Sequence, residues 1–219
     1  MFINSYKKTE CISGCKLFFD DGDFKYWENR PVTTDEIEIV NYINELSNKK
    51  SKILHIGIGN SYFARNIKNF SVIDGITISG SELKLAKKLE IKNYNTHFIN
   101  KFSINALSEN TLSDKYDLIV DANIKSFSCC KEAFEKLFST YVSKLTNNGI
   151  IITGRKGMSW TRLVRPVYTF SIKNFFYKKL KEIDGPVSNI LSINQCEYLA
   201  KIYDLKLFYN EKICTFKKV

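Results

Sequence analysis

Short apolar runs alternate with amphipathic segments over residues 33–152, and this alternation constrains the fold more than any other feature of the chain. In the first amphipathic segment, Ile37, Val40, Ile43 and Leu46 recur at helical spacing. Strands that alternate with helices indicate a parallel sheet with helices on both faces. The expected strands are 53–56, 72–78, 97–99, 116–120 and 150–152, and the expected helices are 33–46, 62–68, 81–89 and 131–145.

The helix and hairpin signals at the two ends of this pattern complete the fold. Thr33 and Glu36 have the spacing of a capping box, and Ser192 can cap a helix that runs to Tyr203. Residues 205–209 and 213–216 then have the pattern of an antiparallel hairpin. We predict an α/β fold: a doubly wound, mostly parallel seven-stranded sheet with helices on both faces and a C-terminal antiparallel hairpin.

One domain accounts for the 219 residues. Within 1–219, we expect residues 1–32 to form an N-terminal cap segment and residues 158–185 to form an inserted helical lid that contacts substrate. In a parallel sheet, ligands bind beyond the carboxyl ends of the strands. Functional residues are therefore expected directly after the strands.

The strand at 53–56 runs into Gly57-Ile58-Gly59, which lets the backbone turn sharply and approach a ligand closely. The dinucleotide fingerprint is not met, because Tyr62 stands in place of its third glycine. Thr77 also occupies the position at which an acid would hold the ribose. A nicotinamide-dependent oxidoreductase is therefore disfavoured, and the phosphate-loop pattern is absent.

Residues 53–61 resemble the first motif of the class I (Rossmann-like) S-adenosylmethionine-dependent methyltransferase family. Further landmarks of that family follow in order at 75–79, 115–121 and 145–153. The resemblance covers the chain from about residue 33 to its end, apart from 158–185. It implies a methyltransferase that uses S-adenosyl-L-methionine and releases S-adenosyl-L-homocysteine.

The chain departs from the family pattern at three positions. His55 stands where the first motif has an acid, Ser61 replaces its third glycine, and Thr77 replaces the acid that commonly holds the ribose. Segments similar to Gly75–Ser79 occur in the cyclopropane fatty acid synthase branch, and a threonine hydroxyl can still bond a ribose. A non-catalytic, cofactor-binding relative stays open as an alternative.

The resemblance implies a set of cofactor-binding residues. Those after the first strand would surround the methionine part, those after the second strand the ribose and adenine, and those after the third the adenine amine. Asp121, after the fourth strand, would face the methyl group or the acceptor. The expected set is His55, Gly57, Gly59, Asn60, Ser61, Thr77, Ile78, Ser103, Asn105 and Asp121. For catalysis, however, a core or turn role is favoured for an isolated histidine such as His55.

A hydroxyl acceptor needs a general base, and the first candidate is Asp121, followed by His97 and Glu28. Two segments, 24–30 and 155–177, are expected to cover the pocket and contact the acceptor. The segment 155–177 is either an anion-binding lid, which favours an anionic small molecule, or an amphipathic insertion with solvated charges; both interpretations stay open. The expected substrate-binding residues are Tyr26, Trp27, Arg155, Trp160, Arg162 and Arg165.

The formal net charge of +10 raises the question of nucleic acid. Lysines dominate the basic residues, whereas bidentate phosphate and base contacts favour arginine. A small-molecule substrate is therefore preferred. An RNA ribose methyltransferase stays open as an alternative, in which Asp121, Lys156 and Glu182 would act together.

No apolar run reaches the roughly 18 residues of a membrane span, and the first residues lack a secretory leader. We therefore expect a cytoplasmic protein without membrane insertion. The six cysteines show no paired spacing typical of zinc, so no metal site is expected. The sequence gives no indication of the oligomeric state.

Overall fold

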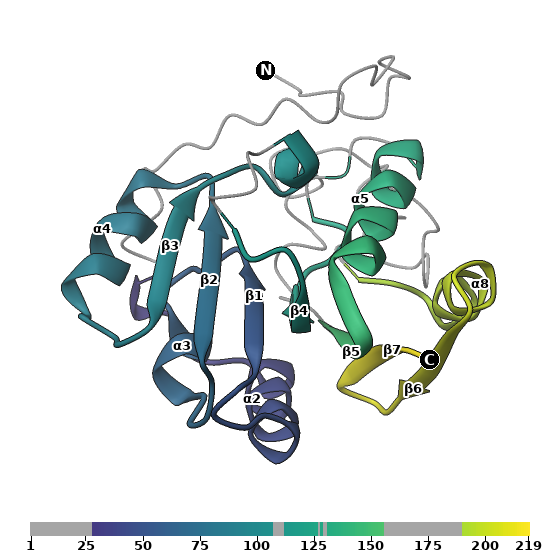
Figure 1. The fold of residues 1–219 in the computed structure, drawn as a ribbon, viewed down its shortest axis with the longest axis horizontal. Helices are drawn as coiled ribbons and strands as arrows, with labels where there is room; N and C mark the ends of the chain where they lie inside the picture. Colours follow the sequence, from purple (N-terminus) through teal and green to yellow (C-terminus); the bar gives the residue numbers. More distant parts are fainter. Residues whose placement is uncertain (1–27, 107–111, 127, 129–130, 156–189) are drawn as a thin grey trace, which may run out of the picture.

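The structure, a computed structural model, describes residues 28–106, 112–126, 128, 131–155 and 190–219. Within them, seven strands form one sheet in the order β3-β2-β1-β4-β5-β7-β6 (Figure 1). The strands are β1 (Lys52–Ile56), β2 (Val72–Thr77), β3 (Tyr94–Phe98), β4 (Tyr116–Val120), β5 (Leu145–Gly154), β6 (Leu205–Tyr209) and β7 (Ile213–Lys218). The helices are α2 (Thr34–Leu46), α3 (Tyr62–Asn66), α4 (Gly80–Lys88), η2 (Lys101–Ala106), α5 (Lys131–Lys144) and α8 (Ile193–Ile202).

The sheet is parallel except at β7. Strand β1 pairs in parallel with both β2 and β4, and β4 pairs in parallel with β5. Strand β7 lies antiparallel between β5 and β6. The predicted mostly parallel seven-stranded sheet with its C-terminal antiparallel hairpin is confirmed, and the parallel strands β1 to β5 end at one common edge.

Two helix starts carry the predicted caps. Thr33 accepts a hydrogen bond from the Glu36 amide, and the Glu36 carboxylate accepts one from the Thr33 amide, which completes a capping box for α2. Ser192 caps α8 in the same way with Gln195. These caps satisfy backbone donors that would otherwise lack partners at the helix ends.

Each face of the sheet carries its own buried apolar cluster. Helices α2 and α3 supply Ile39, Ile43 and Phe63 to the cluster on one face. Helices α5 and α8 supply Phe138 and Leu199 to the cluster on the other face. Burial on both faces fixes the sheet as a central layer and leaves its strand ends for function. No described helix is long and apolar enough to cross a membrane.

Strands β3 and β5 differ most from the expected bounds. Strand β3 begins at Tyr94 and ends at Phe98, earlier than expected, because it is an edge strand whose exposed residues break the apolar run. The expected turn at 147–149 lies inside β5, where Asn148 has φ 67°. The pairing with β4 shifts register there, so the turn residues form an irregularity within the strand.

The expected lid at 158–185 lies outside the described residues, as does most of the cap segment 1–32.

A buried carboxylate ties β2 to its neighbours. Asp74, which is 3% exposed, accepts hydrogen bonds from the side chains of Asn95 and Tyr116 and from the amide and hydroxyl of Ser113. The His97 ring lies 4.0 Å away, an ion-pair distance rather than a hydrogen bond. Burial alone would raise the pKa of Asp74, but the nearby His97 ring, followed by the Asn95, Tyr116 and Ser113 donors, holds it well below its usual range.

The depressed pKa of Asp74 predicts acid-sensitive stability. Its folded pKa lies below the unfolded value of 3.8, so its contribution is complete above about pH 5 and is lost progressively as the pH falls from there through the folded pKa. Asp74→Asn should lower the free energy of unfolding at pH 7 by roughly 2–4 kcal/mol and flatten its decline between about pH 5 and 3. Urea denaturation at several pH values measures both effects. The exposed Asp114→Asn is the matched control, and equal stability of the two variants would contradict the assignment.

Candidate functional site

The loop between β1 and α3 has an unusual backbone. Gly57, Gly59 and Ser61 have φ values of +70°, +51° and +60°, in the left-handed region that favours glycine. The Gly57 amide donates to the Ile76 carbonyl of β2 at 2.9 Å, which fixes the start of the loop. The predicted glycine turn therefore lies at the carboxyl ends of β1 and β2, with Gly57 exposed.

A carboxylate that the sequence analysis missed lies at this loop. Glu82, in the first turn of α4, is 8% exposed and accepts hydrogen bonds from the Gly59 amide at 3.0 Å and the Thr77 hydroxyl at 2.5 Å. The sequence has Thr77 instead of an acid at the end of β2, and the fold brings the Glu82 carboxylate of α4 to that place. The sequence signal that could have identified Glu82 is its position three residues after the helix cap Ser79. That its side chain points toward Gly59 depends on the fold.

The loop rests on side chains from the neighbouring strands. The hydroxyls of Ser61 and Tyr94 lie 3.3 Å apart, and Ser61 is fully buried. Gly75 makes room for this contact, because a Cβ there would lie 2.7 Å from Ile58 Cγ2 and 2.8 Å from Tyr94 Cε2. Burial raises the pKa of Tyr94, so its hydroxyl stays protonated.

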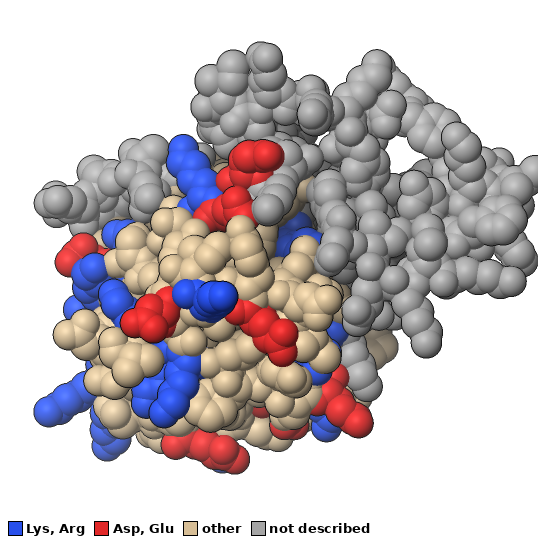
Figure 2. Space-filling view, turned by 90° about the vertical axis from the view of Figure 1, so that its right-hand side faces the viewer, with Lys and Arg blue, Asp and Glu red and all other residues tan. Residues whose placement is uncertain are grey.

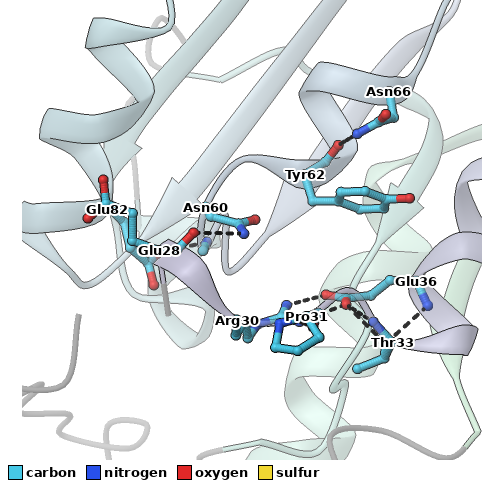
Figure 3. A network of polar contacts seen from close by, with 10 residues as sticks. Glu28, Arg30, Pro31, Thr33, Glu36, Asn60, Tyr62, Asn66 and Glu82 are labelled. Atoms are coloured by element: carbon cyan, nitrogen blue, oxygen red, sulfur yellow. Dashed lines mark hydrogen bonds and ion pairs between the residues drawn. The ribbon is translucent and has the colours of Figure 1, made fainter. Parts of the chain in front are cut away.

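The chain just before α2 lies against the same loop (Figure 3). The Asn60 side chain donates to the Glu28 carbonyl at 3.4 Å. The Arg30 guanidinium makes a two-point ion pair with Glu36, with side chains only 7% exposed. Burial alone would raise the pKa of Glu36, but Arg30 and Thr33 hold it below its usual value. Residues 28–36 are therefore anchored beside the glycine loop.

His55 lies inside the protein on the α3 side of β1. It is 1% exposed, and its ring meets that of Phe63 edge-on, with centroids 4.8 Å apart. Burial lowers the pKa of His55 to about 4, against a weaker opposing effect of Glu36, so the ring is neutral at pH 7. Neither ring nitrogen has a hydrogen-bond partner among the described residues. This is the setting of a core histidine, and its cofactor-binding role stays a prediction.

Asp121 follows β4, as expected, but its carboxylate turns into the protein. It is 2% exposed and accepts hydrogen bonds from Lys101 Nζ at 3.0 Å and the Tyr141 hydroxyl at 2.8 Å. Lys101 also donates to the carbonyls of Asn123 and Ile124. This arrangement joins η2, α5 and the end of β4. A base must reach the acceptor's proton, so the catalytic role of Asp121 stays a prediction that its burial opposes.

The other candidate bases make no side-chain hydrogen bond to the glycine loop among the described residues. His97 lies on β3 beside Asp74, whereas Glu28 is exposed and only its backbone carbonyl contacts the loop, through Asn60. Ile78 follows β2, and Ser103 and Asn105 belong to η2. Seven of the residues named from the sequence lie outside the described residues: Tyr26, Trp27, Lys156, Trp160, Arg162, Arg165 and Glu182. No cluster of three metal-ligating side chains occurs in the described part of the chain.

Arg155 follows β5 at the same edge of the sheet. Its guanidinium donates to the Asn210 carbonyl at 2.8 Å and lies over the Tyr209 ring, 5.3 Å from the centroid. Its backbone amide donates to the Lys212 carbonyl. Arg155 is therefore held against the β6–β7 turn, and its substrate-binding role stays a prediction.

The strand order, the single antiparallel strand and the glycine loop at the end of β1 define the class of fold. The chain has the fold of the class I S-adenosylmethionine-dependent methyltransferases. No protein-family model and no curated protein sequence matches the chain.

Three solved structures illustrate the similarity. The N-methyltransferase NodS from Bradyrhizobium japonicum WM9, in complex with S-adenosyl-L-homocysteine, has a TM-score of 0.56 and 12% identity over 90% of this chain and 96% of that chain. The amino pentose methyltransferase CalS10 from Micromonospora echinaspora has a TM-score of 0.60 and 9% identity over 93% of this chain and 99% of that chain. The [4+2]-cyclase SpnF has a TM-score of 0.52 and 13% identity over 84% of this chain and 63% of that chain. At these identities the similarity establishes the fold.

The packing beneath the loop predicts how two glycines differ. Gly75→Ala should lower the free energy of unfolding by roughly 1–3 kcal/mol, because its Cβ would collide with Ile58 and Tyr94. A Cβ on Gly57 would have no atom within 4 Å. Gly57→Ala should therefore lower the free energy of unfolding by about 1–2 kcal/mol only because of the φ of +70° at this position. Thermal unfolding measures both variants. Replacing Tyr94 by Leu should recover stability in the Gly75→Ala background only, and recovery in both backgrounds would contradict the contact.

Proposed function

We propose that this chain is an S-adenosylmethionine-dependent methyltransferase that acts on a small-molecule acceptor. The observation that carries the proposal is the left-handed loop Gly57–Ser61 with the Glu82 carboxylate against it, at the common edge of β1 and β2. The loop presents exposed backbone, and Glu82 supplies a hydrogen-bond acceptor at the end of β2. This combination suits a ligand with an amino-acid end and a ribose end.

Each part of the cofactor would meet residues of matching chemistry. Gly57, Gly59, Asn60 and Ser61 would hold the methionine part. Thr77 and Glu82 would hold the ribose, because a carboxylate accepts strong hydrogen bonds from hydroxyl groups. The bound cofactor supplies a methyl group already activated on a sulfonium, so the protein's task is mainly alignment and exclusion of water.

The fold comparisons support a methyl-transfer function. NodS is an N-methyltransferase and CalS10 is an amino pentose methyltransferase, and their structures hold S-adenosyl-L-homocysteine and S-adenosylmethionine. The charge distribution favours a small acceptor over RNA: Figure 2 shows basic and acidic side chains interspersed over the described part of one face. Non-specific nucleic-acid binding relies on a continuous basic surface.

A second candidate is a relative that binds the cofactor without methyl transfer. Two observations favour it: His55 and Thr77 replace acids of the family pattern, and the cyclase SpnF shares the fold. Cofactor binding without turnover of any acceptor distinguishes this candidate from the first.

Calorimetric titration with S-adenosylmethionine and S-adenosylhomocysteine tests the proposal. We expect micromolar binding of both by the wild type, and a Kd raised about 10-fold or more by Glu82→Gln, which removes the charge that would accept the ribose hydrogen bonds. Glu90→Gln, an exposed residue just after α4, is the matched control and should leave the Kd unchanged. Well-folded wild-type protein that binds neither compound would refute the proposed function.

A further inference from the structure

The first turn of α2 carries two consecutive acids with opposite surroundings. Glu36 accepts hydrogen bonds from the Arg30 guanidinium and from the amide and hydroxyl of Thr33. Asp35 is 4% exposed, yet its carboxylate has no hydrogen bond or ion pair with any of the described residues. A buried carboxylate without a partner is costly, and a native structure that keeps one calls for an explanation.

The helix start does not explain this burial. The amino end of a helix favours negative charge, which accounts for an acid in the first turn of α2. It does not account for an acid that is only 4% exposed and whose carboxylate receives no donor from the described residues. The neighbouring arginine is already engaged, because Arg30 pairs with Glu36 through both of its terminal nitrogens.

Asp35 is directed at the carboxyl ends of β4 and β5. A Cβ on Gly154, the last residue of β5, would lie 2.8 Å from Asp35 Oδ2 and 2.8 Å from the carbonyl oxygen of Ala122, two residues after β4. Only glycine leaves room for both oxygens at this point. Asp35 Oδ2 therefore lies at the ligand-binding edge of the sheet, beside the Ala122 carbonyl, which accepts a hydrogen bond from the Gly154 amide at 3.2 Å.

This place lies next to the expected cofactor loop without overlapping it. The loop follows β1 and leans on β2, whereas Asp35 lies at β4 and β5, on the other side of β1 in the strand order. A methyl acceptor has to approach the cofactor from strand ends that the cofactor leaves open. The ends of β4 and β5 are such a position.

We infer that Asp35 binds the amino group of an amine acceptor, an inference that rests on the proposed function and names its substrate class. The carboxylate accepts an N–H hydrogen bond from the neutral amine. In the transfer, the nitrogen lone pair forms the new N–C bond while the methyl C–S bond breaks, with its electron pair passing to sulfur. The positive charge thus moves from sulfur to nitrogen, beside the Asp35 carboxylate, and the methylated ammonium later loses a proton to water.

The test compares Asp35→Asn with Glu36→Gln in the full chain. Asp35→Asn removes an uncompensated charge and keeps the shape, so its Tm should equal or exceed that of the wild type. Glu36→Gln leaves Arg30 without its partner and should lower the Tm by several degrees. A Tm loss of more than about 3 °C in Asp35→Asn would show that the carboxylate has a structural partner, and would overturn the inference.

The second readout is S-adenosylhomocysteine production with matched acceptors: glucosamine against glucose, and benzylamine against benzyl alcohol. The wild type should methylate at least one amine and neither alcohol. Asp35→Asn should lower amine turnover about 100-fold or more and keep the Kd for S-adenosylhomocysteine within about threefold of the wild type. Turnover of alcohols only, of no amine, or of amines at similar rates by both proteins would overturn the inference. Failure of the wild type to bind S-adenosylhomocysteine would instead refute the proposed function, and the Tm comparison would still decide whether Asp35 lacks a structural partner.

Discussion

Three residues between β1 and α3 hold a left-handed backbone, and the candidate site depends on the hydrogen bonds that keep them there. The Gly57 amide is bound to Ile76, the Gly59 amide to Glu82, and the Ser61 hydroxyl lies at the Tyr94 hydroxyl. Each bond joins the loop to β2, to α4 or to β3. A loop of this shape would be strained without such support, so the elements around β1 are organised to maintain it.

The site divides into two sides that follow the strand order. The glycine loop, Thr77 and Glu82 form the β1–β2 side, whose hydrogen bonds suit a nucleoside with an amino-acid end. The β4–β5 side holds the Ala122 carbonyl, Gly154 and Asp35, whose carboxylate has no partner among the described residues. Between them, the buried pair of Lys101 and Asp121 fixes the end of β4. In the proposed function the first side holds the methyl donor and the second the acceptor, a separation that group transfer between two ligands requires.

The sequence predicted the parts of the fold that depend on local patterns. The capping box of α2, the Ser192 cap of α8 and the strand β4 were readable because their signals lie within a few neighbouring residues. The bounds of β3 and β5 were not, because an edge strand lacks an apolar run and a register shift depends on the partner strand. In both cases tertiary contacts override the local signal.

The backbone turn of the candidate site could be predicted from the sequence, whereas most contacts of its side chains could not. The glycine turn follows from Gly57 and Gly59 alone. The partners of Asp121 could not be foreseen, because Lys101 and Tyr141 are each 20 residues away in sequence. Likewise, only the packed structure shows that Glu82 turns toward the loop, and that Glu36, unlike the adjacent Asp35, is paired within the described part of the chain.

The most direct test of the central claim is a crystal structure of the protein with S-adenosylhomocysteine. The account predicts the amino-acid end on Gly57–Ser61 and the ribose hydroxyls within hydrogen-bond distance of the Glu82 carboxylate. A ligand bound elsewhere, or a Glu82 carboxylate that keeps only its bonds to Gly59 and Thr77 while the ribose lies apart from it, would contradict the account.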